Sequence, residues 1–339
     1  MATPIPIVFT APGLGPDMSI EVFKQIFHVN SMVLKIHSEY FRNYLDSPDK
    51  SPASSVSGSF KYEWVTQVDE DGTGWSLTAK ENYKSSPKYK PFAGNPQSQV
   101  EAFNTIISAL HNWPIDIKTS YQLCLVAEFA DFYRVLPLMS NALHGVFFEN
   151  HELIKSIPTD CVALIQAAYK LRNKLLFREC FIHVMGPWTH PRSELLQEKK
   201  LRDLAAATYA KITAQIAAIQ YQCLIMTSTP PTGEGRRRQD LGREFGNMIM
   251  RPLLDFQDPV VEDEQLIVPA YYRKLHNLGD VESNLLLKKL KALLNPFIKN
   301  FLVLDRSGVG AGEGPYKNSF LCFELSDQEL PWDIKQRVW

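Results

Sequence analysis

The sequence lacks an excess of charge of either sign, a long apolar run and a basic leader. Its 339 residues include 36 Lys and Arg against 37 Asp and Glu, for a formal net charge of -1. This balance argues against the basic surface by which proteins bind nucleic acid, so no direct nucleic-acid partner is expected. No apolar run approaches the ~18 residues of a membrane span, and residues 1–10 have no basic region before their apolar part. We therefore expect neither a membrane partner nor a signal peptide.

Cysteine is scarce, with five residues in the chain and no C-x-x-C pair among them. Four of the five lie among apolar residues, which is typical of buried free thiols. This pattern favours a reducing compartment, so we expect an intracellular protein of the cytoplasm or nucleus. The apolar fraction of 45% is that of an ordinary globular chain and exceeds what a disordered chain contains.

Recognisable catalytic and metal-binding motifs are also lacking. The sequence has no nucleophile elbow, P-loop, dinucleotide fingerprint or HExxH helix. Residues 308–314 contain four glycines, but Pro315 and a strand-like segment follow instead of the helix that a phosphate loop needs. Cys180 and His183 have the spacing of zinc ligands but no second ligand pair. These absences favour a non-enzymatic protein with no cofactor and no metal.

The first half of the sequence does contain clear strand and helix patterns. Residues 19–29 predict a short hairpin, and residues 32–45 place apolar side chains at helical spacing. Residues 60–79 alternate apolar and polar side chains around Asp71-Gly72, which predicts a strand pair with a tight turn. Two stretches lose this periodicity and are expected to be loop insertions: 47–59 and 80–99.

From residue 100 onward the periodicity is mainly helical. An Ala-rich segment from Ser193 to about Gln222 is longer than an average helix. Residues 223–240 have the Pro and Gly content of a linker and include three consecutive arginines, Arg236 to Arg238. Further helices follow the linker, together with two strand-like runs that are expected to form a short strand pair: 301–304 and 320–325.

Several short motifs occur in the order in which one family has them. Residues 17–45 combine Asp17, a helix start from Phe27 to Leu34, and the segment Ser38-Glu39-Tyr40-Phe41. Longer segments follow along the chain: Phe60 to Leu77, Ala130 to Gly145, Leu171 to Trp188, and Phe320 to Asp333. On these residues the chain resembles the BTB/POZ family, and in particular a large set of fungal BTB-domain proteins.

This resemblance implies an α+β fold with a BTB/POZ-like core of short strands and a helical cluster, followed by a mainly α-helical extension. The implied boundaries are a flexible N-terminus at 1–15, the core at 16–150, a helical extension at 151–222, a linker at 223–240 and a C-terminal helical region at 241–339. BTB domains are protein-interaction modules, so we expect protein partners and a homodimer formed through the core. The candidate interaction residues are Asp17, Ile20, Val22, Phe27, Leu34, Phe41, Tyr44 and Leu45. For Leu34 and Phe41 a core position is favoured, because a helix that follows a hairpin must cover it.

Two alternatives to a plain interaction module stay open. A substrate adaptor of a cullin-based ubiquitin ligase would face the cullin scaffold with residues 31–45 and 120–135. A nuclear regulatory scaffold would use the three arginines as an import signal or a phosphate contact. Asn30 and Ser31 replace the histidine and the basic residue of the usual family helix start, which argues against corepressor binding beside Asp17.

Overall fold

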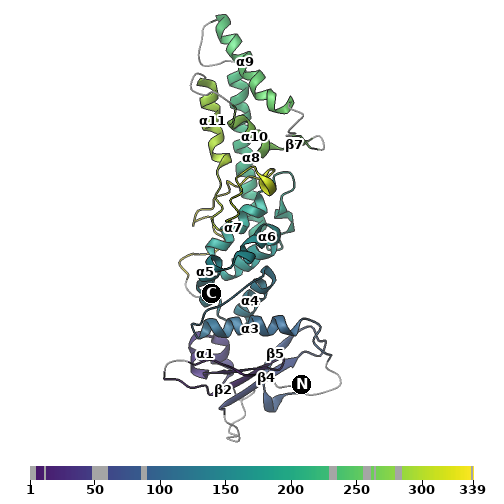
Figure 1. Ribbon diagram of the computed structural model, residues 1–339, viewed down its shortest axis with the longest axis vertical. Helices are drawn as coiled ribbons and strands as arrows, with labels where there is room; N and C mark the ends of the chain where they lie inside the picture. Colours follow the sequence, from purple (N-terminus) through teal and green to yellow (C-terminus); the bar gives the residue numbers. More distant parts are fainter. Residues whose placement is uncertain are drawn as a thin grey trace. The chain divides into compact units, whose positions relative to one another are not determined.

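The computed structural model describes residues 5–10, 13–47, 60–84, 90–228, 235–254, 261–262, 265–278, 285–336 and 339. The chain divides into two compact units (Figure 1). The first unit comprises Met1–Ser156, Ala167–Asn173 and Gln336–Trp339, and the second comprises Ile157–Gln166 and Lys174–Lys335. Helix α6 (His151–Leu171) contributes residues to both.

The first unit combines a mixed sheet with short and long helices, so the expected α+β class is confirmed. Its strands are β1 (Ile7–Val8), β2 (Met18–Val22), β3 (Gln25–Val29), β4 (Tyr62–Val68) and β5 (Trp75–Ala79). Its other elements are α1 (Ser31–His37), α2 (Glu39–Tyr44), the 3-10 turn η1 (Lys80–Asn82), α3 (Pro96–Leu110), α4 (Ser120–Phe132) and α5 (Leu136–Glu149).

The sheet has the strand order β1-β3-β2-β4-β5. Strands β2 and β3 form an antiparallel hairpin, and β4 returns parallel to β2 after the two short helices. Strand β5 then pairs antiparallel with β4. Helix α3 packs against β2 and lies across the sheet in Figure 1.

Both hairpins have turns that the sequence can make. Val22 pairs with Gln25, and the two residues between them, Phe23 and Lys24, have φ values of 44° and 77°. Positive φ at both central residues matches the right-handed twist of the strands. At the second turn Gly72 has φ +77°, and a Cβ there would lie 2.6 Å from the carbonyl oxygen of Pro91. Only glycine fits that position.

Short polar side chains define where α1 and α2 begin. The Asn30 side chain accepts from the backbone amides of Met32 and Val33 at the start of α1. Ser38 is fully buried, accepts from the Phe41 amide at 3.2 Å, and donates to the Tyr133 carbonyl at 2.6 Å. Two caps therefore fix the angle between the helices and tie that junction to the end of α4.

Aromatic side chains fill the core beneath these helices. The rings of Phe41 and Tyr133 are stacked with centroids 5.4 Å apart, and Phe103 meets Tyr133 edge-on at 5.6 Å. Trp64 from β4 is also almost completely buried against Phe41. Burying each such ring contributes about 1.5–3 kcal/mol relative to exposure, so this cluster is a main source of stability in the first unit.

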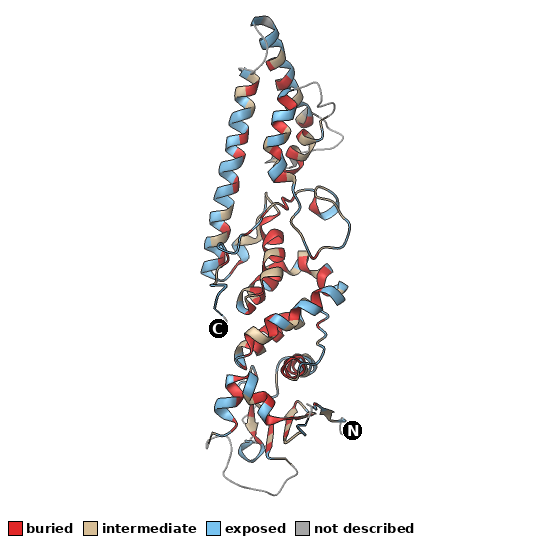
Figure 2. Cartoon of the chain, turned by 90° about the vertical axis from the view of Figure 1, so that its left-hand side faces the viewer, coloured by how far each residue is buried: buried red, intermediate tan, exposed pale blue. Residues whose placement is uncertain are grey.

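The second unit is mainly helical, and Figure 2 shows buried and exposed residues alternating along its helices. Its remaining elements are α7 (Lys174–Met185), η2 (Arg192–Leu195), α8 (Lys199–Ser228), α9 (Gly235–Leu254), β6 (Val261–Glu262), β7 (Gln265–Leu266), α10 (Val268–His276), α11 (Leu285–Ile298) and η3 (Gly314–Tyr316). Helix α8 packs against α9 and α11, and α10 packs against the same two helices.

Irregular backbone follows α11 and is anchored by two charged side chains, buried Glu179 and half-buried Arg273. The Glu179 carboxylate on α7 accepts from the amides of Val303, Leu304 and Asp305 at 2.8, 3.1 and 3.0 Å. Arg273 on α10 donates to the carbonyls of residues 316, 317 and 319. Each charged group thereby satisfies backbone groups that no helix or strand satisfies.

Near both ends of the chain the structure differs from what the sequence predicts. Residues 1–15 are expected to be flexible, but β1 pairs with β3 and Phe9 is buried, because its ring contacts His111 and Trp113. The expected strand pair near the C-terminus does not form: residues 301–304 and 320–325 are irregular, although the Phe301 amide donates to the Leu321 carbonyl at 3.0 Å. Anchoring by Glu179 takes the place of a strand ladder there.

Three internal boundaries also differ. The expected insertion at 80–99 ends early, because α3 begins at Pro96 with Asn95 as its cap. The expected linker at 223–240 is helical at 223–228 and 235–240, so the three arginines lie in α9 and not in a loop. The insertion at 47–59 lies outside the described residues from position 48 onward.

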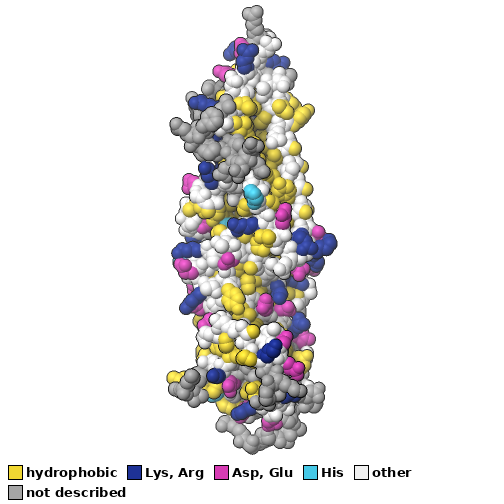
Figure 3. Space-filling model, turned by 90° about the vertical axis from the view of Figure 1, so that its right-hand side faces the viewer, with side chains coloured by type: hydrophobic (Ala, Val, Ile, Leu, Met, Phe, Trp, Pro, Cys, Tyr) yellow, Lys and Arg dark blue, Asp and Glu magenta, His cyan; other side chains and the backbone are white. Residues whose placement is uncertain are grey.

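Charged side chains of both signs are scattered over the face drawn in Figure 3. This distribution agrees with the balanced composition, which gives neither sign an excess. No single-sign patch of the kind that attracts nucleic acid is visible in that view.

Candidate interaction surface

Most of the residues that the sequence marks as candidates for interaction are core residues. Six of the eight have no exposed surface: Ile20, Val22, Phe27, Leu34, Phe41 and Leu45. They lie on β2 and β3, on α1 and α2, or directly after α2, and all six belong to the core of the first unit. Leu34 and Phe41 thus have the core position favoured for them from the sequence, and the other four are buried with them.

Asp17 has a structural role at the start of α1. It is half-buried, and its two carboxylate oxygens accept from the backbone amide and the hydroxyl of Ser31, both at 2.6 Å. The neighbouring Asn30 side chain donates to the Gly15 carbonyl at 2.7 Å. Asn30 and Ser31 therefore join the chain before β2 to α1 through uncharged groups.

Tyr44 is the one candidate with an exposed side chain, and α1 adds two exposed residues that the candidates do not include. Met32 and Ile36 are 55% and 60% exposed and lie one helical turn apart. Their apolar type and spacing are visible in the sequence. The sequence does not show which side of this short helix faces the core, and the structure buries Val33 and Leu34 instead.

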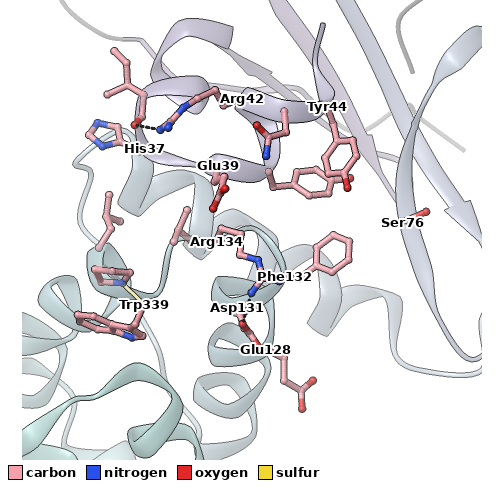
Figure 4. Close-up of a pocket in the computed structure, with 16 residues that line it drawn as sticks. His37, Glu39, Arg42, Tyr44, Ser76, Glu128, Asp131, Phe132, Arg134 and Trp339 are labelled. Carbon is pink, nitrogen blue, oxygen red and sulfur yellow. Dashed lines mark hydrogen bonds and ion pairs between the residues drawn. The ribbon is translucent and has the colours of Figure 1, made fainter. Parts of the chain in front are cut away.

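An open hollow of about 1360 Å³ adjoins this surface in the first unit (Figure 4). It lies between α1 and α2 on one side and the end of α4 and start of α5 on the other. Its lining consists of Ile36, His37, Glu39, Tyr40, Arg42, Asn43, Tyr44, Ser76, Glu128, Asp131, Phe132, Arg134, Val135, Pro137, Leu138 and Trp339. The hollow thus unites two segments, 36–44 and 128–138, that are distant in the sequence.

A row of three aromatic rings forms one wall of the hollow. Tyr40 lies between Tyr44 and Phe132, with centroid distances of 4.9 and 5.1 Å. Tyr40 is buried, and burial together with nearby Tyr44 raises its pKa to about 12, so its phenol is neutral at physiological pH. Tyr44 and Phe132 keep 42% and 49% of their surface exposed. Exposed aromatic rings held by a buried one are the residue type that anchors protein interfaces.

Charged side chains of both signs line the rest of the hollow. Arg42 donates to the carbonyls of Lys35 and Ile36, which are free at the end of α1. Arg134 follows α4, and its guanidinium lies 3.2 Å from the carboxylate of Asp131 in the last turn of that helix. Glu39 and Glu128 are exposed and project from α2 and α4 (Figure 4). Mixed charge around exposed rings suits a polypeptide surface better than a single anion or cation.

Trp339 lines the hollow, and Arg172 holds its ring from outside the lining. The Arg172 guanidinium lies 4.8 Å from the Trp339 ring centroid, and Arg172 also donates to the Gln336 side chain at 2.8 Å. Arg172 has φ +51°, which places it in the left-handed position that ends α6. A cation held against an indole face contributes about 0.5–1 kcal/mol at an exposed site.

The residues considered for metal or phosphate binding have structural roles. Cys180 and His183 are both buried in α7, and burial lowers the pKa of His183 to about 4. Within the described residues no group of three His, Cys, Asp or Glu is placed to hold a metal ion. In the Gly-rich loop the Gly310 amide donates to Glu313, and a single 3-10 turn follows.

Comparison of the chain with protein-family models, with curated proteins and with solved structures finds no match. None of the helices in the described part of the chain combines the length and the apolar content needed to cross a membrane.

Proposed function

We propose that this chain is a protein-interaction module with a BTB/POZ-like core, and that it self-associates through that core. The supporting observation is the order of elements in the first unit. The hairpin of β2 and β3 is followed by two short helices, by β4 parallel to β2, and later by α3, α4 and α5. This order agrees with the resemblance carried by the sequence motifs.

The exposed face of α1 is the proposed centre of self-association. Met32 and Ile36 present adjacent apolar side chains on a helix that Asn30 and Asp17 hold rigidly at its start. Lys35 lies between them in the sequence and is bound to Asp46 at 2.6 Å, so its charge is already balanced. A small apolar centre with a neutralised polar edge is the usual anatomy of a protein interface.

Sedimentation of the purified full chain tests this proposal. We expect a dimer at micromolar concentration, and we expect Met32→Glu with Ile36→Glu to give a folded monomer, because two carboxylates would enter an apolar contact. The matched control is Tyr121→Glu, which changes an equally exposed side chain at the start of α4, away from α1 in the sequence. A wild-type chain that stays monomeric at high micromolar concentration would refute self-association.

The aromatic wall of the hollow favours a second function, that of an adaptor for a cullin scaffold. Tyr44 and Phe132 belong to the two segments, 31–45 and 120–135, that the family resemblance implies for cullin contact. Leu45 is buried, so a substitution there would test folding and not binding.

The adaptor function is tested by mixing the chain with a cullin N-terminal domain and measuring the mass of the complex. A stoichiometric complex is expected, and Tyr44→Ala with Phe132→Ala should weaken it at least tenfold, since loss of one interface hot spot costs about 2 kcal/mol or more. Tyr121→Ala should bind as the wild type does. If no complex forms while the chain still dimerises, the adaptor function is excluded and the interaction module stands.

A further inference from the structure

Helix α8 has a second apolar face that nothing in the described chain covers. Its buried side chains lie on one side of the helix, at Leu201, Ala205, Ile212, Ile216, Ile219 and Met226, and these pack inside the second unit. The opposite side of the helix is exposed along its length in Figure 2. Between residues 204 and 228 the only charged side chain is Lys211, so this exposed side is almost uncharged.

Exposed apolar residues on this side follow alternating spacings of three and four. They are Ala207, Ala210, Ala214, Ala217, Tyr221 and Leu224, all of which are exposed. We call these six residues the α8 stripe. Tyr221 and Leu224 are 62% and 66% exposed, which is unusual for two large side chains one turn apart. Spacings of three and four define the seam of a two-helix coiled coil.

The sizes of the stripe residues are complementary under a two-fold axis. Suppose that α8 of two copies pairs antiparallel, with the two-fold axis passing between Ala214 and Ala217. Each stripe residue of one copy then lies opposite one stripe residue of the other, and we call each such pair a layer. The layers are Ala207 with Leu224, Ala210 with Tyr221, and Ala214 with Ala217. Each large side chain then meets an alanine, so the two helices can approach evenly. A parallel pair would instead set Tyr221 against Tyr221 and Leu224 against Leu224, which separates the helices at one end only.

The charge pattern agrees with the same pairing. Lys211 lies beside the stripe and would face Ala218 of the other copy, so no two like charges meet. Within its own chain Lys211 lies 3.5 Å from Glu329, which leaves the ammonium a partner outside the contact.

We propose that the α8 stripe is an antiparallel contact between two copies of this chain. The stripe extends for about 27 Å at the helical rise of 1.5 Å per residue. A two-helix contact of that length is near the lower limit of about 1,000 Å² for a specific interface, so the association is weak and populates only at high micromolar concentration, above the concentration at which the first unit is expected to dimerise. The proposal concerns the second unit and does not rest on self-association through the first.

Site-specific disulfide formation in the full chain tests both the contact and its direction. Ala207→Cys and Leu224→Cys are prepared separately, mixed at high micromolar concentration and mildly oxidised, and the wild type with its five thiols gives the background. The antiparallel pairing predicts a covalent dimer from the mixture, several-fold above Leu224→Cys alone. A yield no higher than the wild type, or equal yields from Leu224→Cys alone and from the mixture, would overturn the proposal.

A charge at the two-fold axis provides the second arm of the experiment. Ala214→Glu added to both cysteine variants brings two carboxylates together beside the axis and should abolish the covalent dimer. Gln215→Glu is the matched control, because it adds the same charge at the next exposed position, away from the stripe. Circular dichroism verifies that both variants keep their helices. Equal cross-linking in the two variants would also overturn the proposal, whatever the oligomeric state of the first unit.

Discussion

Removing the Glu179 carboxylate should detach the irregular segment after α11 from α7. Glu179 is buried, and its Oε1 accepts from the amides of Leu304 and Asp305 while Oε2 accepts from that of Val303. Burial raises the pKa of this carboxyl, and the three amide donors act in the opposite direction by favouring the charged form. The acceptor and its donors are more than 120 residues apart in the sequence, so the contact closes a long loop.

The expected cost follows from what each amide can do afterwards. In Glu179→Ala all three donors lose their acceptor. Water can reach the amides of Val303 and Asp305, whose residues are exposed or half-buried, but not that of buried Leu304. With about 1–3 kcal/mol for the one buried donor left unsatisfied, we expect a loss of about 1–3 kcal/mol. Glu179→Gln keeps one oxygen for two of the donors, so it should cost about half as much.

Hydrogen exchange measured by mass spectrometry is the appropriate assay, because a chain of two units need not unfold in one step. The amides of residues 303–305 should exchange about tenfold faster for every 1.4 kcal/mol lost. The order should be wild type slowest, then Glu179→Gln, then Glu179→Ala. Glu324→Ala, which removes an exposed carboxylate from the same segment, should leave exchange unchanged. Unchanged exchange in Glu179→Ala, or a faster rate in the Gln variant, would refute the reasoning.

Two further predictions concern single buried groups. His183 has its pKa lowered to about 4 by burial, an effect that Arg192 adds to and Asp305 opposes. The unfolded chain therefore binds a proton more readily, and stability should fall by about 3 kcal/mol as the pH drops from about 6.5 to 4. His183→Gln should reduce that dependence in urea unfolding measured at several pH values. Ser38→Ala removes the cap of α2 and its bond to the Tyr133 carbonyl, and should lower the free energy of unfolding by about 1–2 kcal/mol; an unchanged urea midpoint would contradict this.

Local signals in the sequence were sufficient for β2 to β5 and for the helical character of 32–45, but not for β1 or for the start of α3. The strand pair at 60–79 follows from the alternation of apolar and polar residues and from the turn at Gly72, where the positive φ favours glycine. The helical character of residues 32–45 follows from the spacing of their apolar side chains. In the structure the cap at Ser38 divides this segment into two helices. These features depend on neighbours within a few residues, which is the range over which backbone preference and side-chain period act.

The candidate surface depends on contacts that a sequence does not show. Helices α1 and α2 both contain several apolar residues, yet the fold buries Leu34 and Phe41 and leaves Ile36 exposed. The hollow exists because Ser38 bonds to the Tyr133 carbonyl and so brings α2 beside the end of α4.

The second unit shows the same division between local pattern and tertiary contact. The sequence by itself determined that the Ala-rich segment is a long helix, because alanine has the highest helix propensity. It also determined the spacing of the two apolar faces of α8. Only the tertiary structure decided which face enters the core, because burial depends on the helices that pack against it, α9 and α11. The same holds after α11, where apolar runs suited to strands stay irregular because buried Glu179 and half-buried Arg273 bind their backbone from distant helices.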